Sequence, residues 1–160
     1  MKGKLLSNDQ SCLDAALRYL SYRPRSEWEM KTHLEKKRFS PASVQAVLLS
    51  LREQKLVDDV AFAEFWKTNR ESFSPRSQAM LRNELRRKGI AQDIIAEVTQ
   101  EVDEEASAYE AAQKRARRLT ISDYDSFRRG LAAFLRQRGF NHEVAQQTIN
   151  HLWKERCKDA

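Results

Sequence analysis

The chain has 160 residues, of which 41% are hydrophobic and 32% are charged, and it carries a net charge of +6 at pH 7. This composition excludes a long disordered chain and, with only four Gly and three Pro, also a turn-rich all-β protein. No apolar run has the length of a signal peptide or a membrane span, so we expect a cytoplasmic protein without membrane contact.

The first predicted unit spans residues 11–57 and contains three helices. A first amphipathic helix is indicated by apolar residues at i, i+3, i+4 and i+7, namely Leu13, Ala16, Leu17 and Leu20. Ser26 and Glu29 form a capping-box pair that predicts a second helix, ending near Lys37. Ser40 followed by Pro41 predicts a third helix. Its expected buried face consists of Val44, Val47, Leu48 and Leu51.

The second predicted unit spans residues 58–102. Asp58 and Asp59 suit the start of a helix that continues toward Arg70, and capping is favoured over a catalytic role for this carboxylate pair. The middle helix carries Leu81 and Leu85. The third helix is expected to bury Ile94, Ile95, Val98 and Val102.

The third predicted unit spans residues 103–156. We expect a helix over about 109–118 and a second over about 123–138. Asn141 is the expected N-cap of the last helix. Gly139 stands where a left-handed residue is needed after the middle helix.

The turn after the middle helix differs in the first unit. Gly89 takes the left-handed position in the second unit, as Gly139 does in the third, whereas the first unit has Arg38 there. A residue with a side chain in that conformation costs about 1 kcal/mol. The first turn is therefore expected to be either strained or differently closed.

The apolar pattern repeats about every fifty residues. Leu34, Leu85 and Leu135 lie in register, and the tripeptide Pro24-Arg25-Ser26 recurs as Pro75-Arg76-Ser77. Such a period predicts an all-α, elongated array of three tandem three-helix units, which offers a long surface to a partner. With no coiled-coil heptad seam, we expect a monomer.

Charge alternates along the chain. Residues 1–57 carry 11 basic and 6 acidic side chains, residues 58–108 carry 7 and 11, and residues 109–160 carry 11 and 6. A partner that itself alternates, such as a protein polymer with nucleic acid inside it, would suit this pattern. The alternative is that the charges only solvate helix faces.

Three short runs, together with the tandem units, resemble the RecX family of RecA-regulatory proteins. The runs are Arg-Ser-Glu-Trp-Glu at 25–29, Leu-Val-Asp-Asp-Val-Ala-Phe-Ala at 56–63 and Asn-Glu-Leu-Arg-Arg-Lys-Gly-Ile at 83–90. The resemblance covers about residues 13–153. It implies a regulator, not an enzyme, that binds the RecA filament on single-stranded DNA. It further implies inhibition of the filament's ATPase, strand-exchange and co-protease activities in recombination and DNA repair.

Basic residues on the predicted helices are the candidate contacts. Arg82 and Arg86 lie four residues apart beside buried Leu81 and Leu85, so both are expected to point into solvent, where a guanidinium can clamp phosphate or carboxylate. The full set expected to contact the RecA filament or its DNA is Arg25, Arg76, Arg82, Arg86, Arg87, Lys88, Lys114, Arg115, Arg118, Arg129 and Arg136.

Two other functions stay open at this level. A stand-alone DNA-binding protein with helix-turn-helix-like units would need base-reading residues at the start of its third helices, where this chain has poor base readers. A helical scaffold for another protein is the second alternative.

The histidines and the two cysteines lack metal-ligand spacing, so no metal or other cofactor is expected. Trp66 and Trp153 are expected to pack in the core or between units instead of stacking on bases. Direct DNA binding is expected to be weak.

Overall fold

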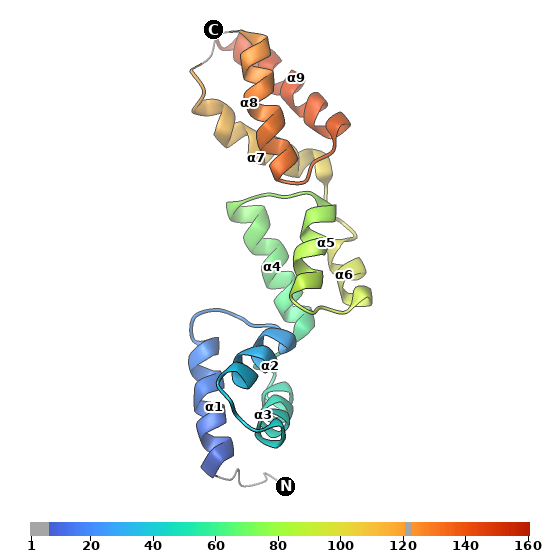
Figure 1. Cartoon of the computed structure of the whole chain (residues 1–160). Coiled ribbons are helices and arrows are strands. Elements are labelled where there is room, and N and C mark those ends of the chain that lie inside the picture. The colour runs from blue at the N-terminus through green and yellow to red at the C-terminus, as the bar shows by residue number, and fades with distance from the viewer. Residues whose placement is uncertain (1–6, 121–122) are drawn as a thin grey trace. The chain divides into compact units, whose positions relative to one another are not determined.

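The computed structural model describes residues 7–120 and 123–160, and in these residues it contains nine α-helices and no strand (Figure 1). The helices are α1 (Ser7–Leu20), α2 (Glu27–Lys36), α3 (Pro41–Glu53), α4 (Asp59–Phe73), α5 (Gln78–Arg87), α6 (Gln92–Thr99), α7 (Glu104–Arg117), α8 (Tyr124–Gln137) and α9 (His142–Lys158). The predicted all-α fold with three successive sets of three helices is confirmed. None of the described helices is both long and apolar enough to cross a membrane.

Capping residues fix where most of these helices begin. Ser26 forms the predicted capping box with Glu29 at the start of α2, and Asn141 accepts from the backbone N–H of Val144 at the start of α9. The helix α7 begins several residues before the expected range of 109–118. Asp103 accepts from the backbone N–H of Ala106 there and caps an earlier start.

Contacts group the chain into two compact units. Unit 1 consists of residues 1–66 and 85–98, and unit 2 consists of residues 67–84 and 99–160. The division passes through α4 and through α5, so each unit holds one outer set of three helices together with parts of the middle set. The boundaries 11–57, 58–102 and 103–156 stay a prediction.

The core of unit 1 lies among α1, α2 and α3, which pack against one another. Met30 and Leu34 of α2 are fully buried, as expected for the apolar face of that helix. The expectation for α1 was wrong in one position, because Leu17 is 41% exposed. Cys12 and Ala16 are the buried residues on this helix, which places the core-facing stripe one position away from Leu17.

The core of unit 2 lies among α7, α8 and α9. Its largest fully buried side chain is Phe127, and Leu131 and Leu135 continue the same face of α8. The buried residues of α7 are all alanines, namely Ala108, Ala111, Ala112 and Ala116. Trp153 packs against this core, as expected, and contacts Phe127 with ring centroids 5.1 Å apart.

A glycine in the left-handed conformation follows the middle helix in the second and third sets, as predicted. Gly89 has φ +76° and Gly139 has φ +89°. Arg38 adopts φ 65°, so the first turn is of the strained kind and not differently closed. Ile94 and Val102 depart from the expected buried set, because both are only half-buried and Val102 lies beyond Thr99, where α6 ends.

Candidate functional site

The first Pro-Arg-Ser turn, Pro24–Ser26, is tied to the end of α5. The hydroxyl of Ser26 accepts from the backbone N–H of Glu29 at 3.1 Å and donates to the carbonyl oxygen of Lys88 at 2.7 Å. The backbone N–H of Glu27 donates to Asp59 at 2.9 Å. Two backbone N–H groups at the start of α2 thus have partners, and the turn joins α2 to the end of α5 within unit 1.

A buried carboxylate lies beneath this turn. The side chain of Glu29 is 5% exposed and pairs with Arg23 at 2.7 Å and with Lys88 at 2.8 Å. Burial alone would raise the pKa of Glu29, but hydrogen bonds and charge from Arg23 and Lys88 outweigh it and lower the pKa below its ordinary value. These two cations are therefore engaged inside unit 1.

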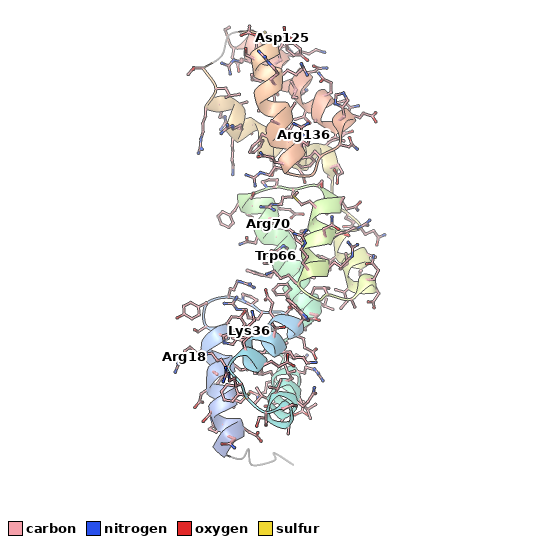
Figure 2. All side chains as sticks on the ribbon, in the orientation of Figure 1. Arg18, Lys36, Trp66, Arg70, Asp125 and Arg136 are labelled. Carbon is pink, nitrogen blue, oxygen red and sulfur yellow. The ribbon has the colours of Figure 1, made fainter. Side chains whose placement is uncertain are left out.

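The same two cations also lie over an aromatic ring. Trp66, labelled with Arg70 on α4 in Figure 2, has the Arg23 guanidinium 5.6 Å and the Lys88 ammonium 5.1 Å from its ring centroid. Phe62 stacks against Trp66 with centroids 5.7 Å apart. Trp66 thus packs within unit 1, as its sequence position indicated.

Arg25 is held by α1. Its guanidinium carbon lies 3.8 Å from the ring centroid of Tyr19, and its Nε donates to the carbonyl oxygen of Tyr19 at 3.2 Å. His33 stacks on Tyr19 with centroids also 3.8 Å apart and planes within 5°. Burial and the charges of Lys37 and Arg25 lower the pKa of His33. Arg25 therefore serves the fold of unit 1.

The second Pro-Arg-Ser turn, Pro75–Ser77, repeats this joint in unit 2. The hydroxyl of Ser77 accepts from the backbone N–H of Met80 at 3.1 Å, and the backbone N–H of Ser77 donates to the carbonyl oxygen of Arg138 at 3.1 Å. The backbone N–H of Gln78 donates to Glu104, in the place that Glu27 and Asp59 take in unit 1.

Glu84 forms ion pairs with two arginines next to this second turn. It is 13% exposed, pairs with Arg70 at 3.0 Å and also pairs with Arg76. The Nε of Arg76 is buried without a hydrogen-bond partner among the described residues. Arg76 is therefore part of the interior of unit 2 and not an exposed contact.

The expectation that Arg82 and Arg86 both point into solvent was wrong for Arg82. Arg82 is half-buried, and its Nε donates to the hydroxyl of Thr99, a buried residue, at 2.8 Å. Arg86 and its neighbour Arg87 are exposed.

A hollow of about 280 Å³ in unit 2 is lined by four basic side chains and by no acidic side chain, and we call it the basic hollow. Its lining consists of Phe73, Ser74, Pro75, Ala111, Lys114, Arg115, Arg118, Phe134 and Arg138. Arg115 and Arg138 have their guanidinium carbons 5.9 Å and 5.0 Å from the ring centroid of Phe134. Phe73 at the rim is 77% exposed.

A second hollow of unit 2, of about 450 Å³, is apolar with a basic rim. Its lining consists of Arg128, Arg129, Ala132, Ala133, Arg136, Phe140, His142 and Ala145. Arg136, labelled on α8 in Figure 2, and Arg129 are exposed there. The structure thus brings together two of the predicted contact residues, beside small apolar side chains.

The aromatic residues two positions before each Pro-Arg-Ser turn were missed by the sequence analysis. They are Tyr22, which is 78% exposed, and Phe73, which is 77% exposed. Extending the repeat two residues upstream from Pro24 and Pro75 would have aligned them.

The paired carboxylates are caps, as favoured from the sequence. Asp58 accepts from the backbone N–H groups of Val60 and Ala61 at the start of α4, and Asp59 accepts from Glu27 at the start of α2. Burial is the main reason that the pKa of Asp59 is raised. The described residues contain no group of three or more side chains that could hold a metal ion.

Family models match two stretches of the chain. The first three-helix domain of RecX matches residues 12–51, and the second three-helix domain of RecX matches residues 58–98. Together these matches cover the first six helices apart from their ends.

Curated relatives extend the match to nearly the whole chain. Regulatory protein RecX of Chlorobium phaeobacteroides is 34% identical over 148 residues, which is 92% of this chain and 97% of the relative. Regulatory protein RecX of Prosthecochloris aestuarii is 33% identical over 146 residues, which is 91% of this chain and 96% of the relative.

Solved structures share the fold. The crystal structure of RecX from Lactobacillus salivarius has a TM-score of 0.72 at 21% identity and covers 92% of this chain and 98% of its own. A second crystal structure, of a regulatory protein RecX, has a TM-score of 0.71 at 24% identity and covers 94% of this chain and 82% of its own. With two family models matched and a relative 34% identical along almost its full length, the chain belongs to the RecX family of RecA-regulatory proteins.

Proposed function

We propose that this protein binds the RecA filament on single-stranded DNA and inhibits the filament's ATPase, strand-exchange and co-protease activities. The observation that carries the proposal is the 34% identity to a regulatory protein RecX over 97% of that protein's length. The protein acts by binding, as a monomer of three helical units, and not by catalysis. A ligand that prefers one state of a filament shifts the filament's equilibrium by its difference in affinity for the two states.

The positions of the candidate cations divide them into two groups. Arg25, Arg76, Arg82 and Lys88 are held by ring stacking, ion pairs or hydrogen bonds inside their units. The exposed candidates are Arg86, Arg87, Lys114, Arg115, Arg118, Arg129 and Arg136. We therefore assign filament contact to the second group. The first group stabilises the fold.

The direct test measures DNA-dependent ATP hydrolysis by RecA from the same cell as increasing amounts of the purified protein are added. The proposal expects a concentration-dependent loss of ATPase activity, and no loss at saturating protein would overturn it. Tight, sequence-preferring binding to bare DNA at physiological salt would instead favour the stand-alone DNA-binding alternative.

Charge reversal tests the assignment of the contact surface. Arg129→Glu with Arg136→Glu changes two exposed residues of α8 and should weaken inhibition at least tenfold. The matched control is Lys31→Glu with Lys154→Glu, which makes the same change in net charge at exposed lysines outside the candidate set. Equal weakening by both double variants would mean that inhibition depends only on net charge.

A further inference from the structure

We propose that the basic hollow of unit 2 binds one nucleotide of a single-stranded DNA. Its phosphate lies against Lys114, Arg115, Arg118 and Arg138, and its base stacks on Phe73. The inference rests on the proposed function for the source of the strand, which is the DNA inside the filament. The residues that would bind the phosphate and the base all belong to unit 2.

In both Pro-Arg-Ser turns the serine donates to the carbonyl oxygen of the residue before a left-handed glycine, through its hydroxyl in unit 1 and its backbone N–H in unit 2, but the two turns differ in charge. In unit 1, Arg23 and Lys88 converge on the buried carboxylate of Glu29. Fifty-one residues later the corresponding positions are Ser74 in place of Arg23 and Met80 in place of Glu29. Met80 thus supplies no carboxylate at the position of Glu29, and the carboxylate near the second turn, Glu84, pairs with Arg70 and Arg76.

Arg138 takes the place of Lys88 at the second turn, because each precedes the left-handed glycine by one residue. Its guanidinium donates to the hydroxyl of Ser74, and among the described residues no carboxylate pairs with it. Burial, followed by repulsion from Arg76 and Arg70, lowers the pKa of Arg138. A ligand that brings negative charge to this position would relieve that repulsion.

Three further cations complete the site from α7. Lys114, Arg115 and Arg118 line the hollow and are exposed, so a ligand reaches them without any change in the core. The lining contains no Asp or Glu. Guanidinium groups bind phosphate through paired hydrogen bonds, which favours a phosphate-bearing ligand for this set.

Phe73 provides the ring on which the base would stack. Its side chain is 77% exposed beside the four cations, whereas the ring of Phe134 in the same lining is already approached by Arg115 and Arg138. An exposed aromatic ring next to phosphate-binding cations is the arrangement by which proteins hold single-stranded nucleic acid without reading its sequence.

The volume of the hollow suits a ligand that is only partly enclosed, with the phosphate inside and the base at the rim. A volume of about 280 Å³ is just below the usual range for small-ligand sites, roughly 300–1,000 Å³. A phosphate with its sugar fits the hollow, while the base remains at the rim where Phe73 lies. An acidic peptide would satisfy the cations but would leave the flat face of Phe73 without a matching planar group.

The first test is direct binding without RecA. Purified protein is titrated into a fluorescein-labelled oligothymidylate and, separately, into an abasic strand of the same length, at low salt, with anisotropy as the readout. Phe73→Ala should weaken binding to oligothymidylate about 5- to 150-fold, the range for loss of one stacked base. It should leave binding to the abasic strand unchanged, and Phe73→Trp should restore oligothymidylate binding.

Unit 1 offers a matched control for the aromatic residue. Tyr22→Ala removes an equally exposed ring from the corresponding position, but the hollow beside Tyr22 contains Asp58, and its Arg23 is paired with Glu29. Tyr22→Ala should therefore change oligothymidylate binding less than twofold. Equal losses for Tyr22→Ala and Phe73→Ala would overturn the assignment to the basic hollow.

The cations are tested by the salt dependence of binding. Arg115→Ala with Arg118→Ala should weaken binding to both strands and lower the slope of log affinity against log salt by roughly 1.4, or about 0.7 for each phosphate contact on a single strand. Lys31→Ala with Lys154→Ala should leave the slope unchanged. An unchanged slope in the Arg115 and Arg118 variant would overturn the proposal.

The same variants separate this inference from the proposed function. If Phe73→Ala and the Arg115 and Arg118 variant bind oligothymidylate like the wild type but fail to inhibit RecA ATPase, the hollow takes a protein segment and the nucleotide proposal is wrong. If wild-type protein binds DNA through Phe73 but does not inhibit RecA, the nucleotide site stands and the proposed function fails.

Discussion

The hydroxyl of Ser26 donates a hydrogen bond to the carbonyl oxygen of Lys88 at 2.7 Å, although the two residues are 62 positions apart in the sequence. The same hydroxyl accepts from the backbone N–H of Glu29 and caps α2. Ser26 is fully buried. One side chain therefore starts a helix and also joins that helix to the end of α5 in unit 1.

Replacing Ser26 with alanine should cost more than the loss of an ordinary cap. A lost N-cap costs about 0.5–2 kcal/mol, and the unmet carbonyl of Lys88 adds about 1 kcal/mol. The control is Ser40→Ala, since Ser40 caps α3 from an exposed position. Urea denaturation should give Ser26→Ala a free energy of unfolding about 1 kcal/mol lower than that of Ser40→Ala. Equal losses of stability would show that the bond to Lys88 contributes nothing.

Gly89 cannot carry a side chain without displacing α2. Its φ is +76°, and a Cβ built on it would lie 2.7 Å from Cγ of Trp28. Gly89→Ala should lower the free energy of unfolding by about 2–4 kcal/mol, from the left-handed conformation and from overpacking together. Thermal melting followed by circular dichroism measures this loss.

Arg38 provides the opposite experiment at the equivalent turn of the first set of helices. It has φ 65° and an exposed side chain. Arg38→Gly should therefore relieve strain and stabilise the protein by up to about 1 kcal/mol. A melting temperature lowered by Arg38→Gly would show that this turn carries no strain that glycine relieves.

Glu29 should make stability depend on acid pH. Hydrogen bonds from Arg23 and Lys88 outweigh the effect of burial and hold the pKa of Glu29 below its ordinary value of 4.5. As the pH falls, the unfolded chain therefore takes up this proton first. The stabilisation is complete above about pH 4.5 and is lost as the pH falls through the lower pKa of the folded state.

A comparison with Glu29→Gln isolates this effect, because the raised pKa of Asp59 acts with the opposite sign and is common to both proteins. Urea denaturation between pH 3 and pH 7 should show the wild type more stable than Glu29→Gln at pH 7 and the two converging at the acid end. A difference that stays constant with pH would contradict the ion-pair account.

Local signals explain which parts of the fold could be predicted. The capping box of Ser26 with Glu29, the proline at the start of α3 and the left-handed Gly89 and Gly139 all act within a few residues, so their chemistry is visible in the sequence. The early start of α7 was missed because Asp103 was not read as a cap. The buried stripe of α1 was misplaced at Leu17 because adjacent apolar positions fit a helical period almost equally well.

The candidate site was less predictable, since ion pairs join residues far apart in the chain. Arg23 and Lys88 meet on Glu29, and Arg76 is drawn to Glu84, so two positions of the candidate list belong to the interior. No spacing rule reveals such pairs before the fold is known. Phe73 is different, since its alignment with Tyr22 in the repeat was available from the sequence.

The two faces of α5 give the last prediction. Leu85 is fully buried, so Leu85→Ala should cost about 2–5 kcal/mol through the cavity that it leaves. Arg82→Glu should cost about 1–3 kcal/mol, because it removes the hydrogen bond to buried Thr99 and places a carboxylate in a half-buried position. Exposed Arg87→Glu should change stability by less than about 0.5 kcal/mol.

Denaturation curves for the three variants, together with RecA ATPase assays on those that fold, separate the roles of these residues. Loss of inhibition by Arg87→Glu at wild-type stability would place Arg87 at the filament contact. Arg82→Glu should reduce inhibition only to the extent that it unfolds the protein at the assay temperature. Full stability with lost inhibition for Arg82→Glu would contradict its assignment to the interior of unit 2.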